Sequence, residues 1–272
     1  MKKTKLIVTD LDGTLLNGTF LKKNNKCSEY TKEYLRNLKN SGHTVVIATG
    51  RIHRSAIDVC DGADFADYVI SDSGSTIYDM ANKEYIFKSG IDKKYVDHIS
   101  SIYNKDEFEY IDFCDLTYYN KLAESYYNID DFVKLFKNKE DILEQELETF
   151  HINIVLKQKD NIYELTDKLR KQFSELKFVT MQDSFSDRKW IEVFNDNISK
   201  YNSIKKISDI EGIANEDIIA FGDGLNDIDM IKNSGVGVAM GNALDVIKES
   251  ADYIALSNDE DGVVRFLENY LN

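Results

Sequence analysis

Carboxylates stand directly after two apolar runs of this chain. Residues 5–9 lead into Asp10-Leu11-Asp12-Gly13-Thr14, and residues 217–221 lead into Gly222-Asp223-Gly224-Leu225-Asn226-Asp227. Two carboxylates placed two residues apart at the end of a buried strand are costly unless a cation lies between them. A divalent metal ion is the simplest such cation, although Asp and Gly are also common in ordinary turns after strands.

The acidic residues of these two motifs predict a site for a hard cation. If the two strands are neighbours in a parallel sheet, Asp10, Asp12 and Asp223 converge at the sheet edge where such folds bind ligands. Carboxylate oxygens, completed by water and a substrate phosphate, are the ligands that Mg²⁺ prefers, so we expect Mg²⁺. The histidines are dispersed and are expected to be surface or structural residues rather than zinc ligands: His43, His53, His98 and His151.

Two further motifs would serve an anionic substrate. Residues 44–48 form another apolar run that ends in Thr49-Gly50-Arg51, and Lys200 is expected at the start of a helix. The Thr49 hydroxyl and nearby backbone N–H groups could hold phosphate oxygens, while Lys200 could supply positive charge. Beside Mg²⁺, a carboxylate can attack phosphorus to give an aspartyl-phosphate that water then hydrolyses. The set therefore favours phosphoryl transfer.

The elements that must position these residues lie at the two ends of the chain. Residues 1–81 and 189–272 alternate apolar strands with amphipathic helices, which predicts an α/β core: a Rossmann-like parallel sheet with helices on both faces. The expected strands are 5–9, 44–48, 68–71, 190–194, 217–221, 235–240 and 253–256, with a hairpin beginning near residue 76. The expected helices are one capped by Ser28 and ending near residue 40, followed by 200–211, 227–233, 243–250 and 261–270.

The middle of the chain has a different character. Residues 82–188 are highly charged, rich in Tyr and without apolar strands that end in Asp or Gly, and they predict a small α+β domain inserted into the core. Its expected helices are 93–104, 130–137 and 163–173, and its expected strands are 107–112, 150–156 and 177–181. Its tyrosines either stack on a substrate ring or pack within the domain: Tyr118, Tyr119, Tyr126 and Tyr127.

Composition narrows the class of protein. The 272 residues carry 34 Lys and Arg against 48 Asp and Glu, and a formal charge of −14 disfavours nucleic acid and anionic membranes as partners. No stretch approaches the ~20 apolar residues of a membrane span, and the first apolar run is too short for a signal peptide. We therefore expect a cytoplasmic protein, monomeric or homodimeric, whose three scattered cysteines are free thiols.

Taken together and in order, the motifs resemble those of the haloacid dehalogenase-like superfamily of phosphatases. The set comprises Asp10-x-Asp12-Gly13-Thr14, Thr49-Gly50-Arg51, Lys200 and Gly222-Asp223-x-x-Asn226-Asp227. The C-terminal stretches at 238–243, 251–253 and 259–263 are similar to the Cof-type branch, which carries its cap domain (type IIB) after the third core strand. The resemblance implies that residues 82–188 are this cap and select the substrate.

The resemblance also implies a role for each motif residue. Asp10 would be the nucleophile and a Mg²⁺ ligand. Asp12 would be the general acid and base, with its main-chain carbonyl on the metal, and Asp223 would complete the metal site. The remaining residues would bind the phosphoryl group or support the site: Leu11, Thr49, Gly50, Lys200 and Asn226 for phosphate, and Asp227 as an orienting group.

Some positions leave alternatives open. Lys200 is followed by Tyr201 where the branch usually has Gly, so a solvated helix lysine remains an option, and Arg51 is either a phosphate or substrate contact or one half of a surface salt bridge. Ser73-Gly74-Ser75 stands where Asn-Gly-Ala is common in the branch.

The expected function is a Mg²⁺-dependent phosphatase of small phosphorylated metabolites, with sugar phosphates as the first candidates. The alternatives are a phosphotransferase or mutase of the same superfamily, although the gap from Thr14 to Thr49 is too short for the cap that mutases carry there, and a non-catalytic phosphometabolite-binding regulatory protein.

Overall fold

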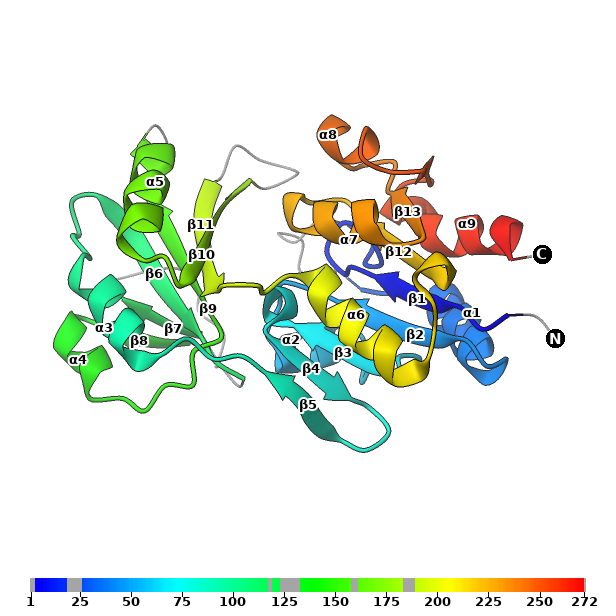
Figure 1. The fold of residues 1–272 in the computed structure, drawn as a ribbon, viewed down its shortest axis with the longest axis horizontal. Helices are drawn as coiled ribbons and strands as arrows, with labels where there is room; N and C mark the ends of the chain where they lie inside the picture. Colours follow the sequence, from blue (N-terminus) through cyan, green and yellow to red (C-terminus); the bar gives the residue numbers. More distant parts are fainter. Residues whose placement is uncertain are drawn as a thin grey trace. The chain divides into compact units, whose positions relative to one another are not determined.

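The computed structural model describes residues 3–18, 26–116, 119–122, 133–157, 161–182 and 189–271. It divides into two compact units: the first comprises residues 1–87 and 199–272, and the second residues 88–198 (Figure 1). Within the described ranges, no helix has both the length and the apolar character needed to cross a membrane.

The first unit is built on an eight-stranded sheet with the order β14-β13-β12-β1-β2-β3-β4-β5. β1 to β3 and β12 to β14 pair in parallel, whereas β4 runs antiparallel to β3. Its strands are β1 (Leu6–Thr9), β2 (Thr44–Ala48), β3 (Tyr68–Ser71), β4 (Thr76–Asp79), β5 (Glu84–Lys88), β12 (Ile218–Gly222), β13 (Val236–Ala239) and β14 (Tyr253–Ile254). Its helices are α1 (Glu29–Asn40), α2 (His53–Val59), α6 (Lys200–Glu211), α7 (Ile228–Asn233), α8 (Asp245–Lys248) and α9 (Gly262–Tyr270).

The central strands are fully buried because helices cover both faces of this sheet. Alternate residues of β1 belong to different cores: Ile7 packs in the cluster that includes α1 and α9, and Val8 packs in the cluster that includes α6. Such two-sided burial explains why these strands read as continuous apolar runs rather than as alternating patterns. The predicted α/β fold class is confirmed (Figure 1).

Most predicted core elements match the structure closely. Strands β2 and β3 and helix α6 have the predicted bounds, and Ser28 caps α1 by accepting a hydrogen bond from the Thr31 N–H at 3.1 Å. The sequence reading missed α2, which begins directly after the Thr49-Gly50-Arg51 motif and has no side-chain cap. The strand predicted to begin a hairpin near residue 76 is β4, which runs antiparallel to β3 and neighbours β5 at the edge of the sheet.

The second unit contains a six-stranded sheet with the order β10-β11-β9-β6-β7-β8. The helices pack on one of its faces, through residues such as Ile99, Ile142 and Leu169. Its strands are β6 (Phe108–Cys114), β7 (Tyr119–Leu122), β8 (Val133–Phe136), β9 (His151–Leu156), β10 (Leu176–Gln182) and β11 (Lys189–Asn195). Its helices are α3 (Lys93–Ser101), α4 (Lys139–Leu143) and α5 (Ile162–Gln172).

Two predictions for the middle of the chain were wrong. The expected helix at 130–137 is in its described part the strand β8, which pairs with β7, because the pairing of Val133–Phe136 overrides a weak helical pattern. The strand expected at 190–194 in the core sheet is β11, which instead pairs with β9 and β10 of the second unit. Residues Tyr118, Tyr126 and Tyr127 lie outside the described residues.

Candidate active site

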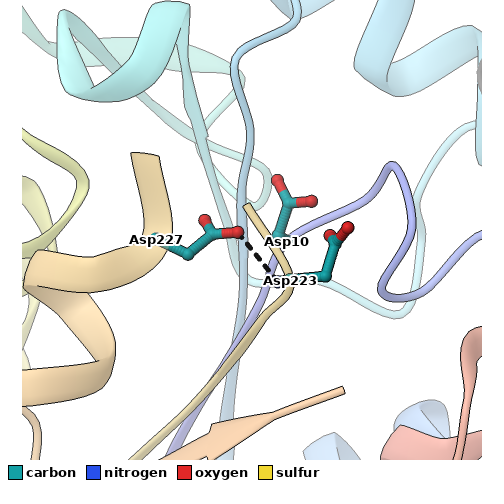
Figure 2. Close-up of side chains that lie close together, drawn as sticks. All are labelled: Asp10, Asp223 and Asp227. Carbon is teal, nitrogen blue, oxygen red and sulfur yellow. Dashed lines mark hydrogen bonds between the residues drawn. The ribbon is translucent and has the colours of Figure 1, made fainter. Parts of the chain in front are cut away.

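The first and fourth motifs meet at one edge of the core sheet. β1 pairs in parallel with β12, with Thr9 opposite Phe221, so both strands release their acidic residues at the same edge. Figure 2 shows the side chains of Asp10, Asp223 and Asp227 gathered there. All are buried, and one ligand oxygen of each lies within 4.8 Å of the others. The predicted convergence of Asp10 and Asp223 is therefore present.

Lys200 joins two of these carboxylates. Its ammonium group donates hydrogen bonds to Asp10 Oδ1 and Asp227 Oδ1, both at 2.7 Å, and its side chain is fully buried. Lys200 is the first residue of α6, where the helix dipole disfavours a cation, so the two carboxylates rather than the helix account for its position. Burial works to lower the pKa of Lys200, but the charges of Asp10 and Asp227 outweigh it and raise that pKa above its usual value. Lys200 is thus not a solvated helix lysine.

Asp227 serves mainly as a structural acceptor. Its Oδ2 accepts hydrogen bonds from the N–H groups of Asp223 at 3.0 Å and Gly224 at 2.9 Å, while its Oδ1 faces Lys200 (Figure 2). Gly222 makes room for it, since a Cβ there would lie 2.4 Å from the Asp227 Cβ. With both oxygens engaged in this way, Asp227 fits the predicted orienting role better than a metal-ligand role.

The first motif holds the side chain of Asp223, whereas Asp227 holds its backbone N–H. Thr14 donates a hydrogen bond from Oγ1 to Asp223 Oδ1 at 3.0 Å, and Gly13 has a φ of +78°. A Cβ at Gly13 would lie 2.4 Å from Asp223 Oδ2, so the turn approaches the carboxylate more closely than any other residue type allows. Asn242 in turn fixes this turn by donating to the Gly13 carbonyl at 2.7 Å.

The donor set fits a hard divalent cation. Asp10, Asp223 and Asp227 place three carboxylates in a buried space where Lys200 contributes a single positive charge. Burial raises the pKa of Asp10 well above its ordinary value, although the Lys200 ammonium opposes this shift. A bound dication would favour the ionised carboxylates, and all the available donors are oxygens, as Mg²⁺ prefers.

Asp12, two residues after Asp10, forms an ion pair with Arg51. Arg51 donates from Nε to Asp12 Oδ2 and from Nη2 to Asp12 Oδ1, both at 2.6 Å, which is a bidentate contact. The Asp12 side chain is 26% exposed and the Arg51 side chain 14%, so the pair is neither buried nor an ordinary surface salt bridge. Of the two alternatives left open for Arg51, the structure shows an ion pair, and its partner is the predicted acid and base.

The predicted phosphate-binding residues surround the same edge. Thr49 is buried at the end of β2, and its Oγ1 accepts a hydrogen bond from the Arg51 N–H at 3.1 Å. Asn226 lies beside Gly50, since a Cβ at Gly50 would be 3.6 Å from Asn226 Nδ2. Leu11 is buried between Asp10 and Asp12, and its carbonyl accepts from the N–H groups of Thr14, Leu15 and Leu16.

Sequence reasoning assigned no contact to several residues that support this site. Thr14 holds Asp223 by donating a hydrogen bond from its hydroxyl. Asn242 and Asn258 brace the chain after β1: Asn258 donates from its N–H to Asn242 Oδ1 at 3.1 Å and from Nδ2 to the Leu16 carbonyl at 2.8 Å. No local pattern reveals the contacts of Thr14 with Asp223, of Asn242 with Gly13 and of Asn258 with Leu16, because each joins residues more than 200 positions apart in the sequence.

Comparison with known proteins decides the family. Residues 7–267 match the family model of haloacid dehalogenase-like hydrolases. The chain belongs to this family. It is 32% identical over 268 residues to the 5-amino-6-(5-phospho-D-ribitylamino)uracil phosphatase YcsE of Bacillus subtilis, covering 98% of this chain and 96% of the relative. A second Bacillus subtilis phosphatase of the same description, YitU, is 31% identical over 289 residues, covering 99% and 98%.

The fold agrees with that of solved structures. A sugar phosphatase of subclass IIB of this family superposes with a TM-score of 0.78 at 23% identity, covering 98% of this chain and 99% of that one. The chain is therefore a phosphatase of the Cof-type branch, as the motifs predicted, and it has the fold of subclass IIB.

Proposed function

We propose that this protein is a Mg²⁺-dependent phosphatase of small phosphorylated metabolites that works through an aspartyl-phosphate on Asp10. The observation that carries the proposal is the buried contact of Asp10 with Lys200, beside Asp223. A buried carboxylate that is held by one ammonium and flanked by two further acids suits a nucleophile better than a structural ion pair, since the excess negative charge is otherwise unfavourable.

In the first half of the reaction, a carboxylate oxygen of Asp10 attacks phosphorus and the bond between phosphorus and the leaving oxygen breaks. Asp12 donates a proton to the leaving oxygen, so the alcohol departs neutral. In the second half, Asp12 takes a proton from water as the water attacks phosphorus, and Asp10 is released with inorganic phosphate. Because Asp12 is paired with Arg51 in this structure, we expect Arg51 to orient the acid between these steps.

The neighbouring residues hold the phosphoryl group. Lys200 offsets charge on Asp10 and on the phosphoryl oxygens, while the amides of Leu11 and Gly50, the Thr49 hydroxyl and Asn226 donate hydrogen bonds to them. Mg²⁺ would be held by Asp10, Asp223 and the main-chain carbonyl of Asp12, and when bound it would neutralise charge on the phosphoryl group.

The two units would have different roles in the reaction. The first unit carries all the motif residues, and we propose that the second unit is the cap that selects the leaving group. By the compact division, the cap would span residues 88–198 rather than the predicted 82–188, because β11 belongs to its sheet.

We extend the substrate class of two relatives to this chain. YcsE and YitU are described as phosphatases of a phosphorylated ribitylamino compound, in which the phosphate sits on a polyhydroxylated chain. We propose phosphate esters of sugars or of such sugar-alcohol chains as the substrates of this chain.

The test is phosphate release from sugar phosphates, ribityl phosphates, flavin mononucleotide and pyridoxal phosphate, with Mg²⁺ or with a chelator. We expect metal-dependent release that Asp10→Asn abolishes and that Asp245→Asn, an exposed acid in α8, leaves unchanged. Loss of substrate without inorganic phosphate would point to a phosphotransferase. Unchanged release by Asp10→Asn would refute the nucleophile.

A further inference from the structure

A buried turn after β3 has an unusual backbone. Asp72, Ser73 and Gly74 have φ values of +51°, +52° and +111°, so three consecutive residues adopt left-handed conformations. Asp72 is fully buried and Ser73 is 5% exposed. Each non-glycine residue in this region costs on the order of 1–2 kcal/mol, and such strain is retained where the surroundings require it.

One side of this turn supports the Thr49-Gly50-Arg51 motif. The N–H of Asp72 donates to the Arg51 carbonyl at 2.9 Å, and the N–H of Ser73 donates to the Thr49 carbonyl at 3.0 Å. The two successive amides thus fix the backbone on both sides of Gly50. The Ser73 hydroxyl also lies close to Gly50. If Gly50 carried a Cβ, that atom would be 3.3 Å from Ser73 Oγ and 3.6 Å from Asn226 Nδ2.

The other side of the turn supports the start of α6. A Cβ at Gly74 would lie 2.4 Å from the Ser199 carbonyl oxygen and 3.1 Å from the Lys200 nitrogen. Ser203, one turn into the helix, donates from Oγ to the Gly74 carbonyl at 2.7 Å. The turn therefore contacts both the loop assigned to the phosphoryl group and the helix end that places Lys200.

We propose that Asp72-Ser73-Gly74 positions these two motifs together and that Ser73 is a further substrate-binding residue, whose hydroxyl donates a hydrogen bond to the phosphoryl group beside Asn226. The proposal rests on the proposed function, because it uses the same phosphoryl site. It explains why a serine accepts a left-handed backbone here: the conformation directs its amide to Thr49 and places its hydroxyl next to Gly50.

Ser73→Gly is the decisive variant, because glycine keeps the left-handed backbone without strain and removes only the hydroxyl. We expect its stability to equal or exceed that of the wild type, while its affinity for inorganic phosphate in the presence of Mg²⁺, measured by calorimetry, falls about tenfold, as for a lost hydrogen bond to a charged group. KM for a sugar phosphate should rise with it. Ser73→Asn, which tolerates this backbone and restores a donor, should recover part of the affinity.

Gly74→Ala tests the positioning role. Its Cβ would displace the start of α6, so we expect a fall in kcat of at least tenfold. Gly212→Ala is the matched control at the other end of α6: it has a φ of +64°, but no described atom lies within 4 Å of its Cβ position. This control should keep the wild-type kcat.

The outcomes separate the two proposals. If the wild type releases phosphate and Asp10→Asn does not, the proposed function stands; if Ser73→Gly then binds phosphate within twofold of the wild type, the substrate contact is refuted. A Ser73→Gly variant that loses stability together with affinity would also refute it, since the hydroxyl would then act within the fold. Equal kcat values for Gly74→Ala and Gly212→Ala would overturn the positioning role.

Discussion

Replacing Lys200 by Met should destabilise the first unit severely. The substitution keeps the length and apolar stem of the side chain but removes the ammonium that is shared by Asp10 and Asp227, whose side chains are 8% and 1% exposed. Removing one partner of a buried ion pair costs about 3–5 kcal/mol, because the remaining charge stays buried without compensation. Here two carboxylates are left behind, so we expect the upper part of that range.

A loss of this size is a large part of the 5–15 kcal/mol that a typical fold possesses, and it should lower the melting temperature by ~10 °C or more. The control is Lys205→Met in the same helix. Lys205 pairs with Asp209 at 3.2 Å, but the two side chains are 53% and 69% exposed, and such pairs contribute less than about 1 kcal/mol.

The assay is urea unfolding in the presence of a chelator, so that no divalent cation substitutes for the ammonium. Unfolding should be followed by circular dichroism. The single tryptophan, Trp190, lies in the second unit, so its fluorescence would report on the unfolding of that unit rather than of the first. Adding Asp10→Asn to Lys200→Met should restore part of the lost stability by removing one unpaired carboxylate. If Lys200→Met unfolds within 1 kcal/mol of Lys205→Met, the reading of Lys200 as the compensating charge of the site is wrong.

Two further variants test other parts of the first unit. Gly13→Ala should abolish metal-dependent phosphatase activity, because the new Cβ would lie 2.4 Å from Asp223 Oδ2. The control is Gly42→Ala: Gly42 has a φ of +91°, but no described atom lies within 4 Å of its Cβ position. This control should lose only about 1 kcal/mol of stability and keep full activity. Equal activities of the two variants would contradict the close approach. Burial lowers the pKa of His53 to about 4. The unfolded state therefore binds more protons between this value and the usual 6.5, and the free energy of unfolding falls as the pH drops through that window. His53→Phe should lose less stability than the wild type between pH 7 and pH 4.5 in urea titrations, and parallel losses would disprove the assignment.

The parts of the site that local sequence could predict are those in which one strand and one turn decide the geometry. Asp10 and Asp223 follow continuous apolar runs, and parallel pairing of such runs brings their ends to one edge, as the register of β1 with β12 shows. Ser28 caps α1 for a similarly local reason. These features depend on short-range propensity and periodicity, which the sequence carries directly.

The parts that could not be predicted depend on contacts between distant residues. Arg51 could have bound phosphate or a surface acid, and its bidentate contact with Asp12 becomes visible only when β1 and β2 are neighbours. The assignment of β11 failed for a related reason: an apolar strand shows that it will pair, but the choice between two sheets is made by partners such as β9 and β10.

The clearest signs of function in this chain are places where local rules are broken. A lysine occupies the first position of a helix, against the helix dipole, and it is fully buried. Asp72 and Ser73 adopt backbone conformations that suit glycine. Each violation is unfavourable by itself, yet the Asp72–Gly74 turn contacts both the Thr49–Arg51 loop and the end of the helix that carries Lys200. Unfavourable features that share contacts are more readily explained by a common role than by separate accidents, so we infer that the turn and Lys200 act together in the site. The effects of Ser73→Gly and Lys200→Met on phosphate affinity should therefore be non-additive when the two substitutions are combined.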